Sequence, residues 1–309
     1  MNSERGRRVL GLRAAPFCTL LLCAWPCEAH WPEGVDRKVV AYPWSFEPWT
    51  VALLAISMVL YLAGIARLWR RAGTGRGIRK SEALMWSAGW LTLVGALVSP
   101  LDPLGESLFS AHMVQHELLM VVAAPLLVLG RPLAAWTWAL PASWRAGAGG
   151  AFRRRGWRLA WATLTHPVMA WSLHALALWG WHLPTLFEAA LAHPSMHALQ
   201  HFSFLGTALL FWWTILGAID RRRQGAALAS LFTTMMHTGA LGALMTLSPL
   251  LWYSHYAATS AAYGLDPLVD QQLGGLIMWI PASVAYLAVG LAIAARGLRS
   301  RPDPVSPIG

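Results

Sequence analysis

The stretch HMVQHELLMVVAAPLLVLG, residues 112–130, decides what kind of protein this chain forms. Two histidines four residues apart open it, and a nearly uninterrupted apolar run follows. The whole stretch has the roughly 17–25 residues that an α-helix needs to cross the hydrocarbon core of a bilayer. Because polar side chains are costly at the edge of such a segment, the two histidines predict a functional site.

The composition of the rest of the chain agrees with a membrane protein. Of the 309 residues, 56% are hydrophobic and only 12% are charged, whereas about 25% are charged in an ordinary soluble domain. The 19 tryptophans also suit the two interfaces of a bilayer. Too few charges remain to cover a soluble protein of this size, so we predict an all-α polytopic membrane protein.

Seven apolar segments have a suitable length to cross the bilayer. We predict transmembrane helices over residues 49–69, 83–99, 112–130, 160–180, 198–219, 226–247 and 271–295. Together they form one predicted transmembrane domain over residues 49–295. Pro125 and Pro281 fall inside two of these segments, where neighbouring helices can satisfy the freed carbonyl groups.

The first 29 residues have the pattern of a signal peptide, with basic residues, a short apolar run and a small residue at Ala29. An uncleaved first anchor is the alternative. Residues 30–48 are then a short periplasmic segment, and residues 296–309 are a cytoplasmic tail. All three cysteines lie within the first 29 residues, so the mature chain offers no thiolate metal ligand.

The distribution of basic residues predicts the orientation of the helices. The connections 67–80 and 131–158 are rich in arginine, as are residues 221–223 and the tail, whereas the three alternate connections contain no Lys or Arg. By the positive-inside rule, the N-terminus is outside and the C-terminus is cytoplasmic, in a multi-pass protein of the bacterial inner (plasma) membrane. We interpret the net charge of +10 as this topology signal, and we expect no nucleic-acid partner.

The histidine phrase occurs a second time, as His197-Ala198-Leu199-Gln200-His201. In each copy the two histidines share one helix face, since they are spaced i, i+4. Both copies open predicted helices that run from outside to inside, so His112, His116, His197 and His201 are candidate ligands of one external metal site. Four methionines, Met113, Met196, Met235 and Met236, stand close in sequence to histidines. Thioether plus imidazole without thiolate suits Cu(I), and we expect each Gln to orient a ring through its other nitrogen. The alternative to a metal site is that these histidines only pack between the helices and bind no metal.

Other chemistry finds less support in the sequence. Glu117 follows His116 as in the H-E-x-x-H zinc motif, but Met120 stands at the second histidine position. There is no defensible Ser-His-Asp arrangement, phosphate loop or thiol redox motif, so we expect no enzyme. His174 and His237 lie nearer the middle of the membrane, where they suit a haem-binding electron-transfer protein as an alternative. A copper transport or resistance protein is another.

A family resemblance rests on these residues and on two further phrases, WGWHLP at 179–184 and DQQLGG at 270–275. Together they resemble the CtaG family of multi-span cytochrome c oxidase assembly factors, over roughly residues 45–295. The resemblance implies a copper-handling inner-membrane protein whose partners are the bilayer and cytochrome c oxidase subunits. The positions that match the family, which we take as the candidate metal site, are His112, His116, His182, His197, His201 and Asp270.

The orientation can be tested with a reporter that is active only in the periplasm. Fusions after Pro103 or Ala192 should be active, because the connections that hold these residues contain no basic residues. Fusions after Gly149 or Arg222 should be silent. The reverse pattern of activity would overturn the assignment of the histidines to the external side.

Overall fold

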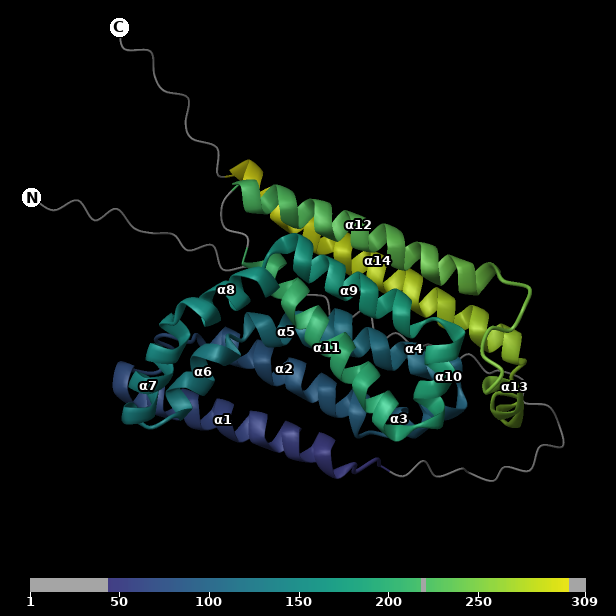
Figure 1. The fold of residues 1–309 in the computed structure, drawn as a ribbon, viewed down its shortest axis with the longest axis horizontal. Helices are drawn as coiled ribbons and strands as arrows, with labels where there is room; N and C mark the ends of the chain where they lie inside the picture. Colours follow the sequence, from purple (N-terminus) through teal and green to yellow (C-terminus); the bar gives the residue numbers. More distant parts are fainter. Residues whose placement is uncertain (1–43, 218–220, 300–309) are drawn as a thin grey trace, which may run out of the picture. The chain divides into compact units, whose positions relative to one another are not determined.

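Helices are the regular structure of the computed structural model, which describes residues 44–217 and 221–299. No strand occurs within these ranges. The longer helices run along one another as a bundle (Figure 1). The helices of the first half are α1 (Pro48–Ala72), α2 (Lys80–Leu97), α3 (Leu101–Ser107), α4 (Phe109–Glu117), the π-helix η1 (Leu118–Ala123), α5 (Ala124–Leu129), α6 (Pro132–Ala139) and α7 (Ala142–Arg153). Those of the second half are α8 (Arg155–Leu164), α9 (Pro167–Trp181), α10 (Pro184–Ala192), α11 (Pro194–Leu216), α12 (Arg221–Leu247), α13 (Tyr256–Thr259), the 3₁₀ turn η2 (Ala261–Tyr263) and α14 (Pro267–Arg299).

Five helices in the described part of the chain are long and apolar enough to cross a membrane. They are Pro48–Ala72, Phe109–Leu129, Pro194–Leu216, Arg223–Leu247 and Pro267–Leu298. Each coincides with one of the predicted segments. The predicted helix 83–99 corresponds to α2, which is long and apolar enough to cross a membrane only when it is taken together with α3, across a bend of 44°.

The predicted helix 160–180 is broken in the structure, so the prediction of seven spans is not confirmed. Helix α8 ends at Leu164 and α9 begins at Pro167. The ring of a proline disfavours the helical conformation for the residue before it, and His166 is extended, with φ −71° and ψ 131°. The 15 residues of α9 extend about 22 Å, less than the roughly 30 Å of a hydrocarbon core. The predicted signal peptide lies outside the described residues.

Helices α12 and α14 lie side by side (Figure 1) because small residues occupy their contact. A Cβ atom on Gly242 would lie 2.7 Å from the carbonyl oxygen of Gly275, and one on Gly275 would lie 2.6 Å from that of Gly242. Only glycine permits this approach of two backbones, as in many membrane helix pairs. The Thr246 hydroxyl, 3.2 Å from the Gln272 carbonyl, joins the same two helices.

A π-helical turn interrupts the helix that carries the first histidine phrase. In η1 the Ala124 N–H donates to Leu119, five residues back, so the carbonyl of Met120 requires the N–H of residue 125. That residue is a proline, which has no N–H. The indole N–H of Trp212, on α11, donates to the Met120 oxygen at 2.8 Å instead. The turn therefore ties α11 to the helix that begins as α4.

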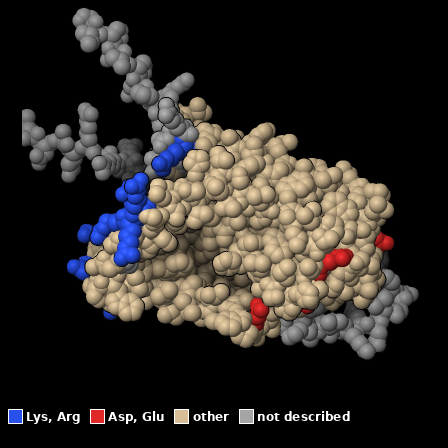
Figure 2. Space-filling model, viewed as in Figure 1, with Lys and Arg blue, Asp and Glu red and all other residues tan. Residues whose placement is uncertain are grey.

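Charged side chains separate along the bundle. Lys and Arg gather at the end that holds α7 and α8, while Asp and Glu are seen toward the opposite end (Figure 2). Helix α8 contains no buried residue, and helix α7 carries Arg145 and Arg153. The two histidine phrases begin α4 and α11 away from the basic end, as the charge pattern of the sequence predicts.

Replacing Trp212 with Phe should destabilise the protein, because the carbonyl of Met120 then stays buried without a donor. An unsatisfied buried carbonyl costs about 1–3 kcal/mol. Chemical unfolding in detergent micelles measures the loss. Trp213→Phe, at the next position of the same helix, is the matched control and should cost less. Equal losses would show that the hydrogen bond to η1 contributes nothing beyond the volume of the indole ring.

Candidate metal centre

The structure brings the two histidine phrases together from helices α4 and α11. Within each helix the rings are adjacent, with centroid distances of 4.3 Å between His112 and His116 and 4.2 Å between His197 and His201. Between the helices, His112 and His197 are 5.5 Å apart and His116 and His201 are 5.6 Å apart. The spacing i, i+4 thus places four imidazoles in one cluster, which we call the histidine cluster.

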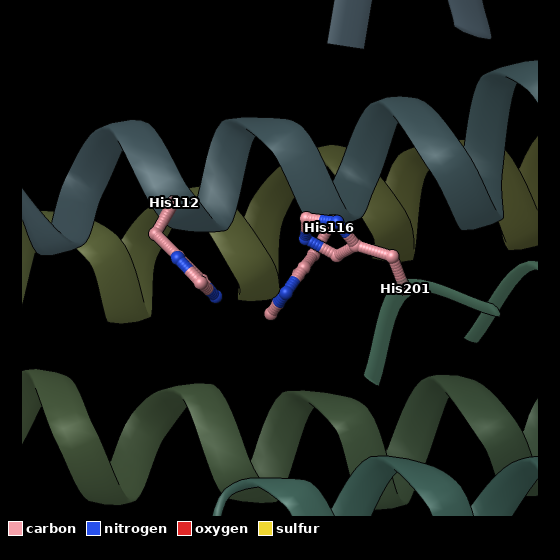
Figure 3. Close-up of side chains that lie close together, drawn as sticks. All are labelled: His112, His116 and His201. Atoms are coloured by element: carbon pink, nitrogen blue, oxygen red, sulfur yellow. The ribbon is translucent and has the colours of Figure 1, made fainter. Parts of the chain in front are cut away.

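Three members of the histidine cluster lie close enough together to hold one metal ion. Each of His112, His116 and His201 offers a ring nitrogen, and the three nitrogens lie within 4.8 Å of one another. Figure 3 shows His112 and His116 on one helix, with His201 reaching toward them from another. A centre with metal–nitrogen bonds of about 2 Å holds such nitrogens roughly 3.5 Å apart, which small side-chain rotations achieve.

Unpaired nitrogens inside the bundle support this interpretation. His112 and His116 are 1% and 2% exposed, and neither ring nitrogen of either residue makes a hydrogen bond of ordinary geometry to the described residues. The Nε2 atom of His201 is also buried and unpaired. Buried polar atoms are nearly always paired, because an unpaired one costs free energy. A metal cation would satisfy all three rings at once.

His182 adds a fifth ring next to the histidine cluster. It ends α9, and its Nδ1 lies 2.7 Å from the carbonyl oxygen of Leu178. Since a carbonyl only accepts, Nδ1 carries the proton and Nε2 carries the lone pair. The ring centroid lies 6.0 Å from that of His116, and Nε2 has no partner among the described residues. His182 is therefore available as a further ligand.

Three carboxylates, those of Asp102, Glu106 and Glu47, lie near one side of the histidine cluster, and we call this side the acidic approach. The carboxylate of Asp102 lies within 4.8 Å of ligand nitrogens of both His197 and His201, and Asp102 and His197 are only half-buried. Glu106 and Glu47 are also close enough to interact with His197 electrostatically. Gln115, which we expected to orient a ring, donates instead to Asp102 at 2.8 Å and to the Ala96 carbonyl at 2.7 Å.

Aromatic side chains cover the histidine cluster on another side. Phe187 lies 5.0 Å from His112 and 4.1 Å from Tyr253, and Tyr253 lies 5.0 Å from Phe109. The Tyr253 hydroxyl donates to the carbonyl of His182 at 2.9 Å. These residues come from three separate segments, so no local sequence pattern could have identified them.

Glu188 holds the segment that carries Tyr253 in place. The backbone N–H and the hydroxyl of Ser254 both donate to its carboxylate, at 2.7 and 2.6 Å. The Ser254 hydroxyl and N–H hold the pKa of Glu188 below its ordinary value, so the carboxylate stays charged. The aromatic cover is therefore anchored to α10 by a charge-assisted contact.

Asp270, the last candidate from the sequence, lies outside the group of close ligand atoms. Its carboxylate accepts hydrogen bonds from the N–H groups of Phe109 and Ser110 and from the hydroxyls of Ser110 and Ser260. These donors include the first N–H groups of α4, which need partners outside the helix. Asp270 thus joins the start of α14 to the start of α4, and its lone pairs are already used.

Replacing Asp270 with Ala should lower the free energy of unfolding by about 3 kcal/mol, because several buried donors lose a charged acceptor. The folded variant should still bind copper, but more weakly, because Asp270 positions α4 and offers no ligand atom close to the ring nitrogens. Asp266→Ala is the matched control, because it removes an exposed carboxylate that only caps α14, at a cost of about 1 kcal/mol. Complete loss of copper from folded Asp270→Ala protein would contradict a role confined to positioning α4 and would make Asp270 a ligand.

The fold and the histidine cluster together define a class of protein, namely a helical membrane protein with a buried nitrogen-rich centre and an acidic approach. The family model described as cytochrome c oxidase caa3 assembly factor, Caa3_CtaG, matches residues 59–300. The chain belongs to this family, and the resemblance found in the sequence is confirmed.

Curated relatives are similar over nearly the whole chain. The uncharacterized protein ML1998 of Mycobacterium leprae is 29% identical over 94% of this chain and 45% of its own length. The uncharacterized protein Mb0105 of Mycobacterium bovis is 26% identical over 93% of this chain and 44% of its own length. The chain therefore spans less than half the length of these relatives. No solved structure matches it significantly.

Proposed function

We propose that this protein binds copper as Cu(I) on His112, His116 and His201 and delivers it to a cytochrome c oxidase subunit during assembly. The observation that carries the proposal is the group of three buried ring nitrogens, unpaired and within 4.8 Å of one another. The family supplies the process, which is assembly of an oxidase. The copper and its ligands are our proposal.

The proposed ligands are compatible with copper but do not by themselves distinguish it from other metals. Imidazole nitrogen binds copper, zinc, iron and nickel, so the ligand set admits several metals. A protein that assembles a copper-containing oxidase has a use for copper, which selects that metal. Three nitrogens from two helices also suit a cargo metal, because the ligand set is small enough to release it to a partner with more ligands.

The acidic approach provides a path by which a copper ion can enter the histidine cluster. Asp102 and His197 are half-buried at the edge of the histidine cluster, with Glu106 exposed beyond them. Carboxylates at the mouth of a site raise the local concentration of cations and speed their capture. His201 belongs both to the outer group with Asp102 and to the inner group with His112. A cation can therefore pass from the outer to the inner ligands by exchanging one ligand at a time.

The copper proposal predicts the effect of replacing two ligands. His116→Ala combined with His201→Ala should abolish copper binding, because one nitrogen of the inner group remains. Metal analysis of anaerobically purified protein measures this, with His255→Ala as the control. His255 is exposed, and its Nε2–H donates to the Glu106 carbonyl, 3.0 Å away. Copper retained by the folded double variant would show that these histidines are not the site.

The same variants test the role in the cell. A strain without the gene should make oxidase subunits that lack activity, and excess copper should partly restore it by mass action. His116→Ala should resemble the deletion, whereas His166→Ala, exposed at the start of α9, should resemble wild type. Full oxidase activity in the deletion strain under copper limitation would remove the delivery role and favour copper transport or resistance.

A further inference from the structure

Helix α8 lies on the surface of the bundle, and the described residues leave an apolar stripe along it largely uncovered. The stripe consists of residues at the spacing i, i+3, i+4, i+7, which share one helix face, namely Trp157, Ala160, Trp161 and Leu164. Trp157 is 50% exposed and Leu164 is 40% exposed, and no residue of α8 is buried. Apolar helix faces are normally covered, so the stripe indicates a partner outside the chain.

Helix α7 adds further exposed aromatic side chains next to this stripe. Phe152, near the end of α7, is exposed, and its ring centroid lies 5.3 Å from that of Trp157. Trp144, near the start of α7, is exposed as well. Exposed Trp and Phe on short helices are typical of segments that lie at the interface between a bilayer and water. The two helices thus have the apolar side chains of an interfacial segment.

Arginines are interleaved with these apolar side chains. Four that are exposed lie at the end of α7 and on α8, namely Arg153, Arg154, Arg155 and Arg158, within the basic end of the bundle (Figure 2). Residues 118–187 contain no Asp or Glu, so neighbours in sequence do not neutralise these charges. Arg155 and Arg158 fall outside the apolar stripe of α8, because each residue turns the helix by about 100°. A partner must therefore accept apolar side chains and positive charge together.

The contacts of α8 place it beside the end of a membrane-crossing helix. The ring of Trp161 lies 5.6 Å from that of Trp213, edge to face, and Trp213 is three residues from the end of α11 at Leu216. The helices Phe109–Leu129 and Pro194–Leu216, both long and apolar enough to cross a membrane, precede and follow α7 and α8 in the chain. This attachment keeps α8 near the depth where the hydrocarbon core meets the headgroups.

We propose that α7 and α8 form an interfacial segment that binds anionic phospholipids of the leaflet at the basic end. The apolar stripe of α8 enters the boundary between headgroups and acyl chains, and the arginines bind lipid phosphates, which guanidinium groups match in geometry and charge. A soluble acidic protein would match the arginines but not the apolar stripe beside them. The inference is independent of the copper proposal, because it shares no residue with the histidine cluster.

Spin labelling of the full chain in vesicles of phosphatidylcholine and phosphatidylglycerol measures the position of α8. Cys18, Cys23 and Cys27 are replaced with Ser, and one label is attached at Ala160→Cys or at Ala162→Cys. Both alanines are exposed on α8, but only Ala160 lies on the apolar stripe. The label at position 160 should collide mainly with molecular oxygen, which concentrates among acyl chains, and the label at 162 with a water-soluble nickel chelate. Equal access of the chelate to both labels would overturn the proposal.

Native mass spectrometry of the purified full chain, titrated with phosphatidylglycerol or with phosphatidylcholine, measures the preference for anionic lipid. Wild type should bind phosphatidylglycerol more tightly. Arg155→Gln combined with Arg158→Gln should weaken that binding about fivefold for each arginine removed and leave phosphatidylcholine binding unchanged. Arg155→Lys with Arg158→Lys keeps both charges and is the matched control, which should bind nearly as wild type does. A wild-type protein without preference, or a Gln variant that binds phosphatidylglycerol as tightly as wild type, would overturn the proposal, and the first result would favour an acidic protein as the partner.

Discussion

The carboxylate of Asp270 fixes the position of α4, on which the geometry of the histidine cluster depends. It accepts the first N–H groups of α4 together with the hydroxyls of Ser110 and Ser260. A fully buried carboxylate is tolerated only when it is hydrogen-bonded in this way. Because α14 is a helix of 33 residues that packs on both α12 and α4, this cap holds α4 at a set height and rotation. His112 lies two residues beyond Ser110, so the cap also sets where the first ring points.

The second constraint joins α4 to α11. The π-helical turn and Pro125 leave the Met120 carbonyl without a backbone donor, and Trp212 supplies one. This contact lies on the same two helices that carry His116 and His201. Met120 is about one turn beyond His116, and Trp212 is about three turns beyond His201. One indole hydrogen bond therefore secures the register in which the two histidine phrases meet. π-helical turns often occur next to functional sites, and here the turn follows His116 directly.

The charged side chains divide the bundle into two ends of opposite charge (Figure 2). The end with α7 and α8 gathers the arginines (Figure 2), whereas Asp102 and Glu106 accompany the histidine cluster at the other. A cation is thus favoured at the histidine end and disfavoured at the basic end. The aromatic cover of Phe109, Phe187 and Tyr253 excludes water on one side of the histidine cluster, which strengthens electrostatic interactions within it. Among the described residues, the half-buried Asp102 and His197 mark the side on which the histidine cluster approaches the surface.

The sequence by itself determined the class of the protein, the positions of most spans and the histidines worth examining. Apolar runs of the length of a bilayer form helices whatever surrounds them, because lipid cannot satisfy an open backbone. The spacing i, i+4 likewise places two rings on one face without tertiary information. The sequence shows a proline at position 167, but it does not show that the predicted helix 160–180 breaks there. Whether this proline ends a helix depended on how α8 and α9 pack.

Only the tertiary structure decided which polar residues act together. The family resemblance placed Asp270 with the histidines, yet in the structure its carboxylate caps α4. Gln115 orients Asp102 and not an imidazole, and Tyr253 reaches His182 from 71 positions away in the chain. A hydrogen bond depends on atoms within about 3 Å, and distances of that kind between remote segments follow from packing, which no local pattern of residues encodes.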